Sequence, residues 1–210
     1  MMPEGMSRRL PSVAILLLAA GKASRMGEGG PHKLLATFDG VPLVRRMAEQ
    51  ACATASPVIV VTGHRQAEID TALAGLGVET VYNPNHATGM ASSIIAGFDA
   101  DTVGDTDGVL IMLADMPGIT AADLSALIAA FRVAAGEVVV RAVSDGKRGN
   151  PVILPRSLRA AVLGLRGDIG ARSVLEHCGL PIIDVEIGAA ALLDVDTPEA
   201  VIAAGGVLKD

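Results

Sequence analysis

One acid stands directly after an uninterrupted apolar run. Asp115 follows Val109–Leu113 within Asp115-Met116-Pro117, and a proline at that point ends the pairing of a strand. A carboxylate beside apolar surface is costly unless a cation or a hydrogen-bond donor accompanies it. Mg²⁺ is such a cation, because it binds one or two carboxylates together with phosphate oxygens and water. Asp115 is therefore a candidate metal ligand and a candidate catalytic residue.

A second acidic pair stands in Asp194-Val195-Asp196-Thr197-Pro198. Residues two apart on an extended segment share a face, so spacing alone does not choose between Asp194 and Asp196. Either acid would complete a two-carboxylate Mg²⁺ site with Asp115. Such acids also serve as caps and turn residues, so this alternative stays open.

Small residues and two cations follow the first apolar run of the chain. Leu18-Ala19-Ala20-Gly21 leads to Arg25, and Lys33 comes after a Gly/Pro stretch. Small residues let the backbone approach a ligand closely, and successive N–H groups hold phosphate oxygens. Arg25 and Lys33 supply the positive charge that a triphosphate requires. The loop has neither the P-loop pattern nor the glycine pattern of a dinucleotide site, and a flexible surface loop is the alternative.

Three further polar stretches complete the candidate site. In Asn83–Ser93, Gly89 permits a tight turn, and Ser92 and Ser93 present donors at a helix start, although a simple serine-capped helix explains them too. In Asp145–Pro155, Gly149 and Pro151 predict a fixed turn around Asn150, with Lys147 and Arg148 as a solvated part of it. The third stretch predicts a turn that enters an anion-binding helix start, and its residues are Gly167, Asp168, Ile169, Gly170, Ala171 and Arg172.

Composition narrows the class of ligand. The formal net charge of −6 and the aromatic content of 2% argue against nucleic acid, which needs basic surface and stacking rings. No apolar run approaches the roughly 20 residues of a membrane span. Cys52 and Cys178 are isolated thiols, which suits a reducing cytoplasm and offers no metal cluster, and the four histidines are scattered along the sequence. We expect a cytoplasmic protein with a small phosphorylated ligand.

Strand-like and helix-like segments alternate along the whole chain, which predicts a doubly wound, mostly parallel α/β sheet with helices on both faces. The expected strands are Val13–Ala19, Val58–Thr62, Val78–Tyr82, Val109–Leu113, Val138–Ala142 and Ile182–Ile187. The expected helices are Pro42–Ala55, Gln66–Ala74, Met90–Ala100, Ala121–Ala134, Ser157–Leu163, Ala171–His177 and Pro198–Ala204. Ligands of such sheets bind at the carboxyl ends of the strands, where the loops described above lie.

Nothing in the sequence divides the chain into two domains. We expect a loose tail over residues 1–11 and a single domain over residues 12–210. Arg8 and Arg9 before Val13–Ala20 also resemble a secretion signal, but the run is short and continues into the Gly-rich loop, so a buried first strand explains it better.

The motifs resemble those of the nucleotidyltransferases related to molybdenum cofactor biosynthesis, and the molybdenum cofactor cytidylyltransferases match best. The resemblance covers Val13–Ala204 and rests on the Leu18–Gly27 loop with Lys33, Asp115-Met116-Pro117, Asp196-Thr197-Pro198 and Gly167–Arg172. It implies a Rossmann-like fold and Mg²⁺-dependent transfer of CMP from CTP to molybdopterin. Ala20 indicates CTP, because the guanylyl-transferring relatives tend to have glycine there. A recipient molybdoenzyme is a candidate partner.

The resemblance also implies roles for particular residues. Leu18, Ala19, Ala20 and Gly21 would hold the nucleotide, Arg25 and Lys33 its phosphates, and Asp115 with Asp196 the metal, leaving Asp194 in reserve. Gly89, Ser92 and Ser93 would lie near the base. Asn150, Pro151 and the Gly167–Arg172 stretch would line the acceptor site. The chain departs from the family pattern in having Ala23 where a polar residue is usual, Asn150 where histidine is common, and a longer stretch before Lys33.

Three other functions remain in view. A guanylyltransferase or another NTP transferase would keep the fold and change the base. A nicotinamide-dependent oxidoreductase related to this family would act on a heteroaromatic substrate, although Val58–Thr62 runs into Gly63-His64-Arg65 without the acid that binds ribose. A carrier that holds the cofactor for a molybdoenzyme would bind both ligands and release no pyrophosphate.

Overall fold

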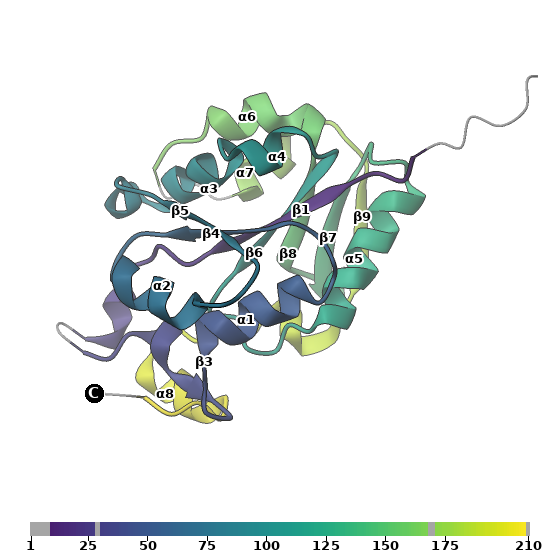
Figure 1. Cartoon of the computed structure of the whole chain (residues 1–210). Coiled ribbons are helices and arrows are strands. Elements are labelled where there is room, and N and C mark those ends of the chain that lie inside the picture. The colour runs from purple at the N-terminus through teal and green to yellow at the C-terminus, as the bar shows by residue number, and fades with distance from the viewer. Residues whose placement is uncertain (1–8, 28–29, 168–170, 209–210) are drawn as a thin grey trace, which may run out of the picture.

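The computed structural model describes residues 9–27, 30–167 and 171–208. Within these residues, seven strands form one sheet in the order β5-β4-β1-β6-β8-β7-β9 (Figure 1). The strands are β1 Val13–Leu18, β4 Val58–Thr62, β5 Glu79–Tyr82, β6 Gly108–Leu113, β7 Val139–Ser144, β8 Lys147–Pro155 and β9 Ile182–Glu186. Strand β8 pairs antiparallel with β6 and β7, whereas the other neighbours pair parallel. The mostly parallel sheet is confirmed.

Helices cover both faces of the sheet. Figure 1 shows α3, α4, α6 and α7 on one side and α1, α2 and α5 on the other. Their bounds are α1 Leu43–Cys52, α2 Gln66–Leu73, α3 Met90–Phe98, α4 Asp101–Gly104, α5 Ala121–Val133, α6 Arg159–Leu163, α7 Ala171–His177 and α8 Pro198–Ala203. A short hairpin of β2 (Thr37–Phe38) and β3 (Val41–Pro42) lies near α8. Among the described helices, none has the length and apolar character needed to cross a bilayer.

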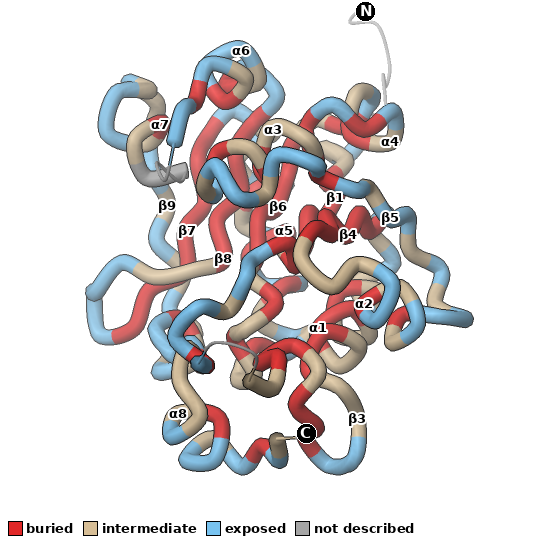
Figure 2. Tube along the Cα trace, turned by 90° about the vertical axis from the view of Figure 1, so that its left-hand side faces the viewer, coloured by how far each residue is buried: buried red, intermediate tan, exposed pale blue. Residues whose placement is uncertain are grey.

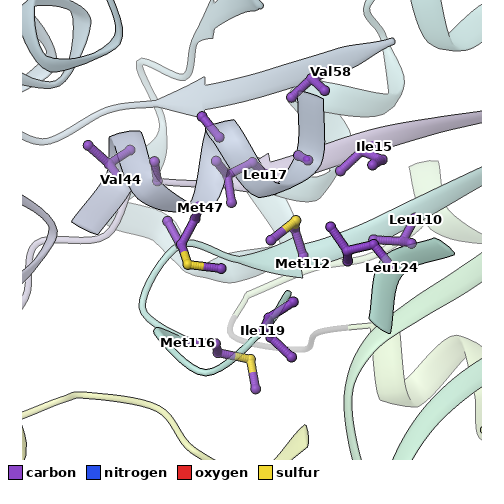
Figure 3. Packing of buried hydrophobic residues seen from close by; sticks show 14 of the residues in the cluster. Ile15, Leu17, Val44, Met47, Val58, Leu110, Met112, Met116, Ile119 and Leu124 are labelled. Atoms are coloured by element: carbon purple, nitrogen blue, oxygen red, sulfur yellow. The ribbon is translucent and has the colours of Figure 1, made fainter. Parts of the chain in front are cut away.

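The core consists of two mainly aliphatic layers, one on each face of the sheet. Figure 2 shows that buried residues concentrate along the central strands. Alternate residues of a strand point to opposite faces, so Ile15 and Leu17 of β1 face one layer while Leu16 faces the other. Figure 3 shows the first layer, where Met47 of α1 packs near Met112 of β6. Strands buried on both faces explain why the sequence shows continuous apolar runs rather than alternation.

Two helices begin with side-chain caps. The Thr120 backbone N–H donates to Asp123 Oδ2 at 2.9 Å, and the Asp123 N–H donates to Thr120 Oγ1 at 3.3 Å, which closes a capping box at α5. The Thr197 hydroxyl accepts from the Ala200 N–H at 3.2 Å, and Pro198 is the first residue of α8. The other predicted helices and all six predicted strands are confirmed, with ends moved by up to three residues.

One strand of the seven-stranded sheet was not predicted, and neither was the short hairpin of β2 and β3. Residues Lys147–Pro155 form β8, so the fixed turn expected at Gly149–Pro151 is wrong. The turn is instead at Asp145-Gly146, where both residues have positive φ, 48° and 71°. Two residues with positive φ make the tight hairpin that joins β7 to β8. The same Asp-Gly pair at 39–40 joins β2 to β3.

The chain order of the sheet contains a switch point between β1 and β6. After β1 the chain proceeds through α1 to β4 on one side, and after β6 it proceeds to β7 and β8 on the other. A crevice forms outside the carboxyl ends of strands at such a point. The Gly-rich loop follows β1 and Asp115 follows β6, so both lie at this crevice.

Candidate active site

A lysine ammonium lies between the two carboxylates at the switch point. The Lys33 Nζ donates to Asp115 Oδ2 at 2.5 Å and to Asp196 Oδ1 at 2.5 Å. Arg25 from the Gly-rich loop pairs with the second oxygen of Asp196. Four charged side chains that the sequence places far apart therefore meet in one cluster.

Burial and charge shift the pKa values within this cluster. Burial raises the pKa of Asp115 above its ordinary value despite the Lys33 ammonium, and the charges of Asp196 and Asp194 act in the same direction. Burial alone would lower the pKa of Lys33, but the carboxylates of Asp115 and Asp196 outweigh it and raise that pKa. Partial burial also opposes ionisation of Asp196, yet Lys33 and Arg25 hold its pKa below the usual range.

The carboxylate of Asp115 has an unused oxygen. Its Oδ1 is buried and has no hydrogen-bond partner, which is costly for a carboxylate oxygen. Two carboxylates with an orphaned oxygen suit Mg²⁺, which completes its coordination with phosphates and water. Among the described residues, no group of three or more His, Cys, Asp or Glu is arranged to hold a metal by itself. The donor set therefore fits a metal that arrives with a phosphate ligand.

The structure separates the two acids that the spacing left open. The buried Val195 between them donates its N–H to the Asp115 carbonyl at 2.9 Å, so the two acidic loops are joined through their backbones. Asp196 points into the cluster, whereas Asp194 is exposed and lies outside the cavity next to it. The geometry brings Asp196 to Asp115.

A cavity of about 440 Å³ adjoins the acidic cluster. Its lining includes nine of the residues predicted from the sequence for the nucleotide and the metal, namely Leu18, Ala20, Gly21, Arg25, Lys33, Gly89, Ser93, Asp115 and Asp196. Ala19 is buried below the loop, where its N–H donates to the Val61 carbonyl at 2.9 Å. Ser92 also lies outside the lining, because its hydroxyl donates to the carbonyls of Asn85 and Gly89.

The methyl group of Ala20 points toward the turn after β4. A methyl at Gly63 would lie 2.9 Å from the Ala20 Cβ and 2.7 Å from the His86 Cβ, so only glycine fits between them. The Ala20 carbonyl accepts from the His64 N–H at 3.2 Å. Any effect of this methyl on base choice therefore also depends on the position of the Gly63 turn.

Three of the four histidines, which are scattered along the sequence, lie close together in space. The rings of His32 and His64 are 5.7 Å apart, and those of His64 and His86 are 6.4 Å apart. His32 is buried, its Nε2 lies 3.2 Å from the Gly21 carbonyl, and its Nδ1 has no partner. Burial is the main cause that lowers the pKa of His32 to about 4, so the ring is neutral and supports the loop as a donor.

A second cavity of about 590 Å³ shares Met90 and Leu113 with the first. It lies between the sheet and helices α3 and α7, and Asn150 of β8 lines it. Pro151 is buried beside it. Gly149 also lines it, and a methyl at Gly149 would lie 2.8 Å from the Ala191 Cβ, so β8 and the segment before Asp194 touch directly.

Only part of the predicted anion-binding turn lies within the described residues. Gly167 is exposed, and its carbonyl accepts from the Ala91 N–H near the start of α3 at 3.2 Å. Asp168, Ile169 and Gly170 lie outside the described residues. Ala171 begins α7 and Arg172 follows it, as the sequence predicts, but their side chains are not among those described.

Two polar residues of the site were not singled out from the sequence. Asn83 is buried, and its side-chain NH₂ donates to the hydroxyls of Ser92 and Ser93, which fixes the start of α3. Arg141 lies within β7 and lines the second cavity. A single arginine within the apolar run Val138–Val143 was an available signal, because a buried charge needs a partner.

Comparison with known proteins agrees with this geometry. The sequence model of the MobA-like NTP transferase domain matches residues 15–182, which is most of the chain. The chain belongs to this family. A curated relative, the nicotine blue oxidoreductase of Paenarthrobacter nicotinovorans, is 31% identical over 175 residues, which cover 80% of this chain and 83% of the relative.

Solved structures share the fold of this NTP transferase domain. A nucleotidyl transferase from Methanothermobacter thermautotroptrophicus superposes with a TM-score of 0.77 at 23% identity, over 92% of this chain and 96% of the other. A CMP:2-keto-3-deoxy-manno-octonic acid synthetase solved with CTP superposes with a TM-score of 0.73 at 16% identity, over 92% and 96% of the two chains. At these identities the likeness establishes the fold.

Proposed function

We propose that this protein transfers CMP from CTP to molybdopterin in a Mg²⁺-dependent reaction that releases pyrophosphate. The observation that carries the proposal is the bridge of Lys33 between Asp115 and Asp196, beside a cavity lined by the Gly-rich loop. This arrangement supplies two carboxylates for a metal and two cations for phosphates at the mouth of one cavity.

The chain's own residues bind and orient the reactants. The N–H groups of the Gly21 loop, with Arg25 and Lys33, hold the triphosphate, and the two cations exchange their carboxylate partners for phosphate oxygens. Asp115 and Asp196 would hold the metal, which when bound would supply stabilisation for charge on the α-phosphate and on the departing pyrophosphate. An oxygen of the acceptor phosphate attacks the α-phosphorus, and the bond to the bridging oxygen of pyrophosphate breaks. The acceptor oxygen is already anionic near neutral pH, so the reaction requires no protein nucleophile.

The identities of the two substrates rest on separate arguments. The resemblance of the motifs to cytidylyltransferases, including Ala20, favours CTP, and a protein of the same fold has been solved with CTP. A methyl group normally gives only about 1–3 kcal/mol of discrimination, so the surrounding loop must contribute to any strict base choice. The second cavity, which meets the first at Met90 and Leu113, offers room for the acceptor.

The test is pyrophosphate release by the purified protein with Mg²⁺, molybdopterin and either CTP, GTP or ATP. Release that requires molybdopterin and occurs with CTP supports the proposal. Release with GTP alone would support nucleotidyl transfer but would show that the nucleotide substrate carries guanine and not cytosine. Binding of CTP and molybdopterin without release of pyrophosphate would identify a carrier instead.

A nicotinamide-dependent oxidoreductase is the second candidate, favoured by the 31% identity to the nicotine blue oxidoreductase. The region after β4 opposes it, because Thr62 is followed by Gly63, His64 and Arg65 and not by an acid that would bind ribose. Titration with NADPH separates the two candidates: tight NADPH binding without CTP binding would favour the oxidoreductase.

A further inference from the structure

The second cavity contains a buried arginine whose guanidinium is only partly used. Arg141 is 8% exposed and is the register partner of Asp184 on the neighbouring strand β9. Its Nε donates to Asp184 Oδ1 and its Nη2 to Asp184 Oδ2, each at 3.0 Å, in a two-point ion pair. Its Nη1 makes no hydrogen bond to any described residue, although the side chain lines the cavity.

The rest of the lining is mainly apolar, and its polar members are Arg148, Asn150 and Glu176. Ile94 of α3, Ile111 of β6 and Val152 of β8 form walls around Arg141. Such walls pack against the apolar faces of a ring and offer no polar contacts to a highly charged group. Because the cavity shares Met90 and Leu113 with the nucleotide cavity, a ligand held by Arg141 extends toward Asp115.

The ion pair determines what kind of ligand atom suits Arg141. Asp184 balances the charge of the guanidinium, so Nη1 presents N–H donors without a net positive charge. Arginine has no acceptor, so the ligand must offer a carbonyl oxygen or an unprotonated ring nitrogen. A neutral acceptor edge fits this ion pair better than a phosphate, because the Asp184 carboxylate would repel a second anion at the same guanidinium.

We propose that Arg141 recognises the hydrogen-bond acceptor edge of a flat heterocyclic substrate in the second cavity, with Asp184 as the positioning residue that fixes the guanidinium. The inference rests on the proposed function in taking this cavity as the acceptor site, since a pterin carries such an edge. It also extends beyond that function, because any planar heteroaromatic carbonyl compound presents the same atoms.

The test measures binding of neopterin, a fluorescent pterin, by fluorescence titration, and binding of Mg²⁺–CTP to the same protein by calorimetry. Replacing Arg141→Met should weaken neopterin binding roughly tenfold or more, the loss expected when hydrogen bonds from a charged donor are removed. Asp184→Asn should weaken it by a smaller factor, and Arg141→Lys should not restore it, because an ammonium cannot make the two-point pair. Affinity for Mg²⁺–CTP should not change.

Matched variants separate recognition from folding. Lys147→Met removes a cation from the same hairpin outside the cavity lining and should leave neopterin binding intact. If Arg141→Met alone does not fold, the double variant Arg141→Met/Asp184→Leu removes both charges of the pair. It then measures neopterin binding without Arg141 and without an unpaired carboxylate. Neopterin binding equal to wild type in a folded Arg141 variant would overturn the inference.

The two proposals fail separately. Binding of Mg²⁺–CTP without binding of neopterin or nicotine blue would overturn the role of Arg141 and leave the nucleotide site standing. Arg141-dependent neopterin binding without CTP binding would support the inference and reject the proposed transferase. Arg141-dependent binding of nicotine blue, without binding of neopterin, would support recognition of an acceptor edge by Arg141. It would also show that the heterocycle is not a pterin.

Discussion

At the scale of single residues, Lys33 is the central group of the site. Its ammonium holds Asp115 and Asp196 at a common position, and Arg25 shares the second carboxylate. The side chain of Lys33 is 11% exposed, so its charge would be costly without these partners. The same pairing leaves Asp115 Oδ1 without a donor, which only a further cation or donor satisfies.

Replacing either acid of the cluster should remove activity. Asp115→Asn and Asp196→Asn keep the side-chain shape and lose a metal ligand, so the rate of pyrophosphate release should fall by about 10²-fold or more, the scale of losing one electrostatic contact in a transition state. Asp194→Asn is the matched control, since Asp194 is exposed outside the cavity. Equal losses in all three variants would contradict the assignment of Asp196.

Buried His32 should make stability depend on pH. Its folded pKa of about 4 lies below the ordinary value of 6.5, so the unfolded chain binds the proton more readily. The contribution is complete above pH 6.5 and is lost progressively as pH falls toward 4. Between pH 7.5 and 5 it should reduce the free energy of unfolding by about 2 kcal/mol.

Urea unfolding at both pH values measures this contribution. His32→Gln should show a smaller drop between pH 7.5 and 5 than the wild type, and the exposed His177→Gln serves as the control. An unchanged drop in His32→Gln would mean that another buried group carries the dependence.

The sequence predicted the positions of most candidate site residues better than their interaction partners. The positions of Arg25, Lys33 and Asp115 after their strands follow from strand patterning and the rule for strand ends. The choice of Asp196 over Asp194 needed the hydrogen bond from Val195 to the Asp115 carbonyl, which joins residues 80 apart in sequence. The ion pair of Arg141 needed the register of β7 on β9.

At the scale of elements, β8 determines the second half of the site. Its antiparallel direction returns the chain from the Asp145-Gly146 turn along β7 and β6, which brings Asn150 to the cavity wall. Sequence patterning missed this strand because its first half is polar and its apolar half, Val152–Leu154, is short. The Asp-Gly pair was the available signal, since it favours a two-residue hairpin.

Helix α3 should tolerate no side chain where it crosses β1. A methyl at Gly97 would lie 2.7 Å from one Leu16 methyl carbon and closer to the other, and Leu16 is fully buried. Gly97→Ala should therefore lower the free energy of unfolding by about 1–3 kcal/mol through overpacking. Gly104→Ala in α4 is the matched control: nothing lies within 4 Å of its added methyl, and the change should stabilise by up to about 1 kcal/mol. Denaturant unfolding of the two variants compares them.

At the scale of the molecule, the mostly parallel sheet brings the carboxyl ends of β1 and β6 together at one edge. The alternation of strand-like and helix-like segments was enough to predict this architecture, because each layer of the core is built from local patterns. The place of each strand in the sheet was not predictable in the same way, since strand order depends on long-range pairing.

The metal and the nucleotide should stabilise the whole chain only together. Lys33 already balances much of the charge of Asp115 and Asp196, so Mg²⁺ alone should raise the melting temperature little. Saturation with Mg²⁺–CTP at 100 times its Kd adds about 2.7 kcal/mol. For a chain of this size, that corresponds to a rise of roughly 5–10 °C. Thermal unfolding with CTP and EDTA, and with Asp115→Asn, should abolish the rise; a full rise without metal would contradict the site.

The contact between Gly149 and Ala191 has a mechanical consequence. Because Gly149 has no side chain, the backbone of β8 lies directly against Ala191 in the segment that leads to Asp194 and Asp196. A displacement of β8 at Gly149 should shift this segment and, with it, Asp196. We therefore expect a ligand that displaces β8 in the second cavity to alter the alignment of Asp196 beside the first.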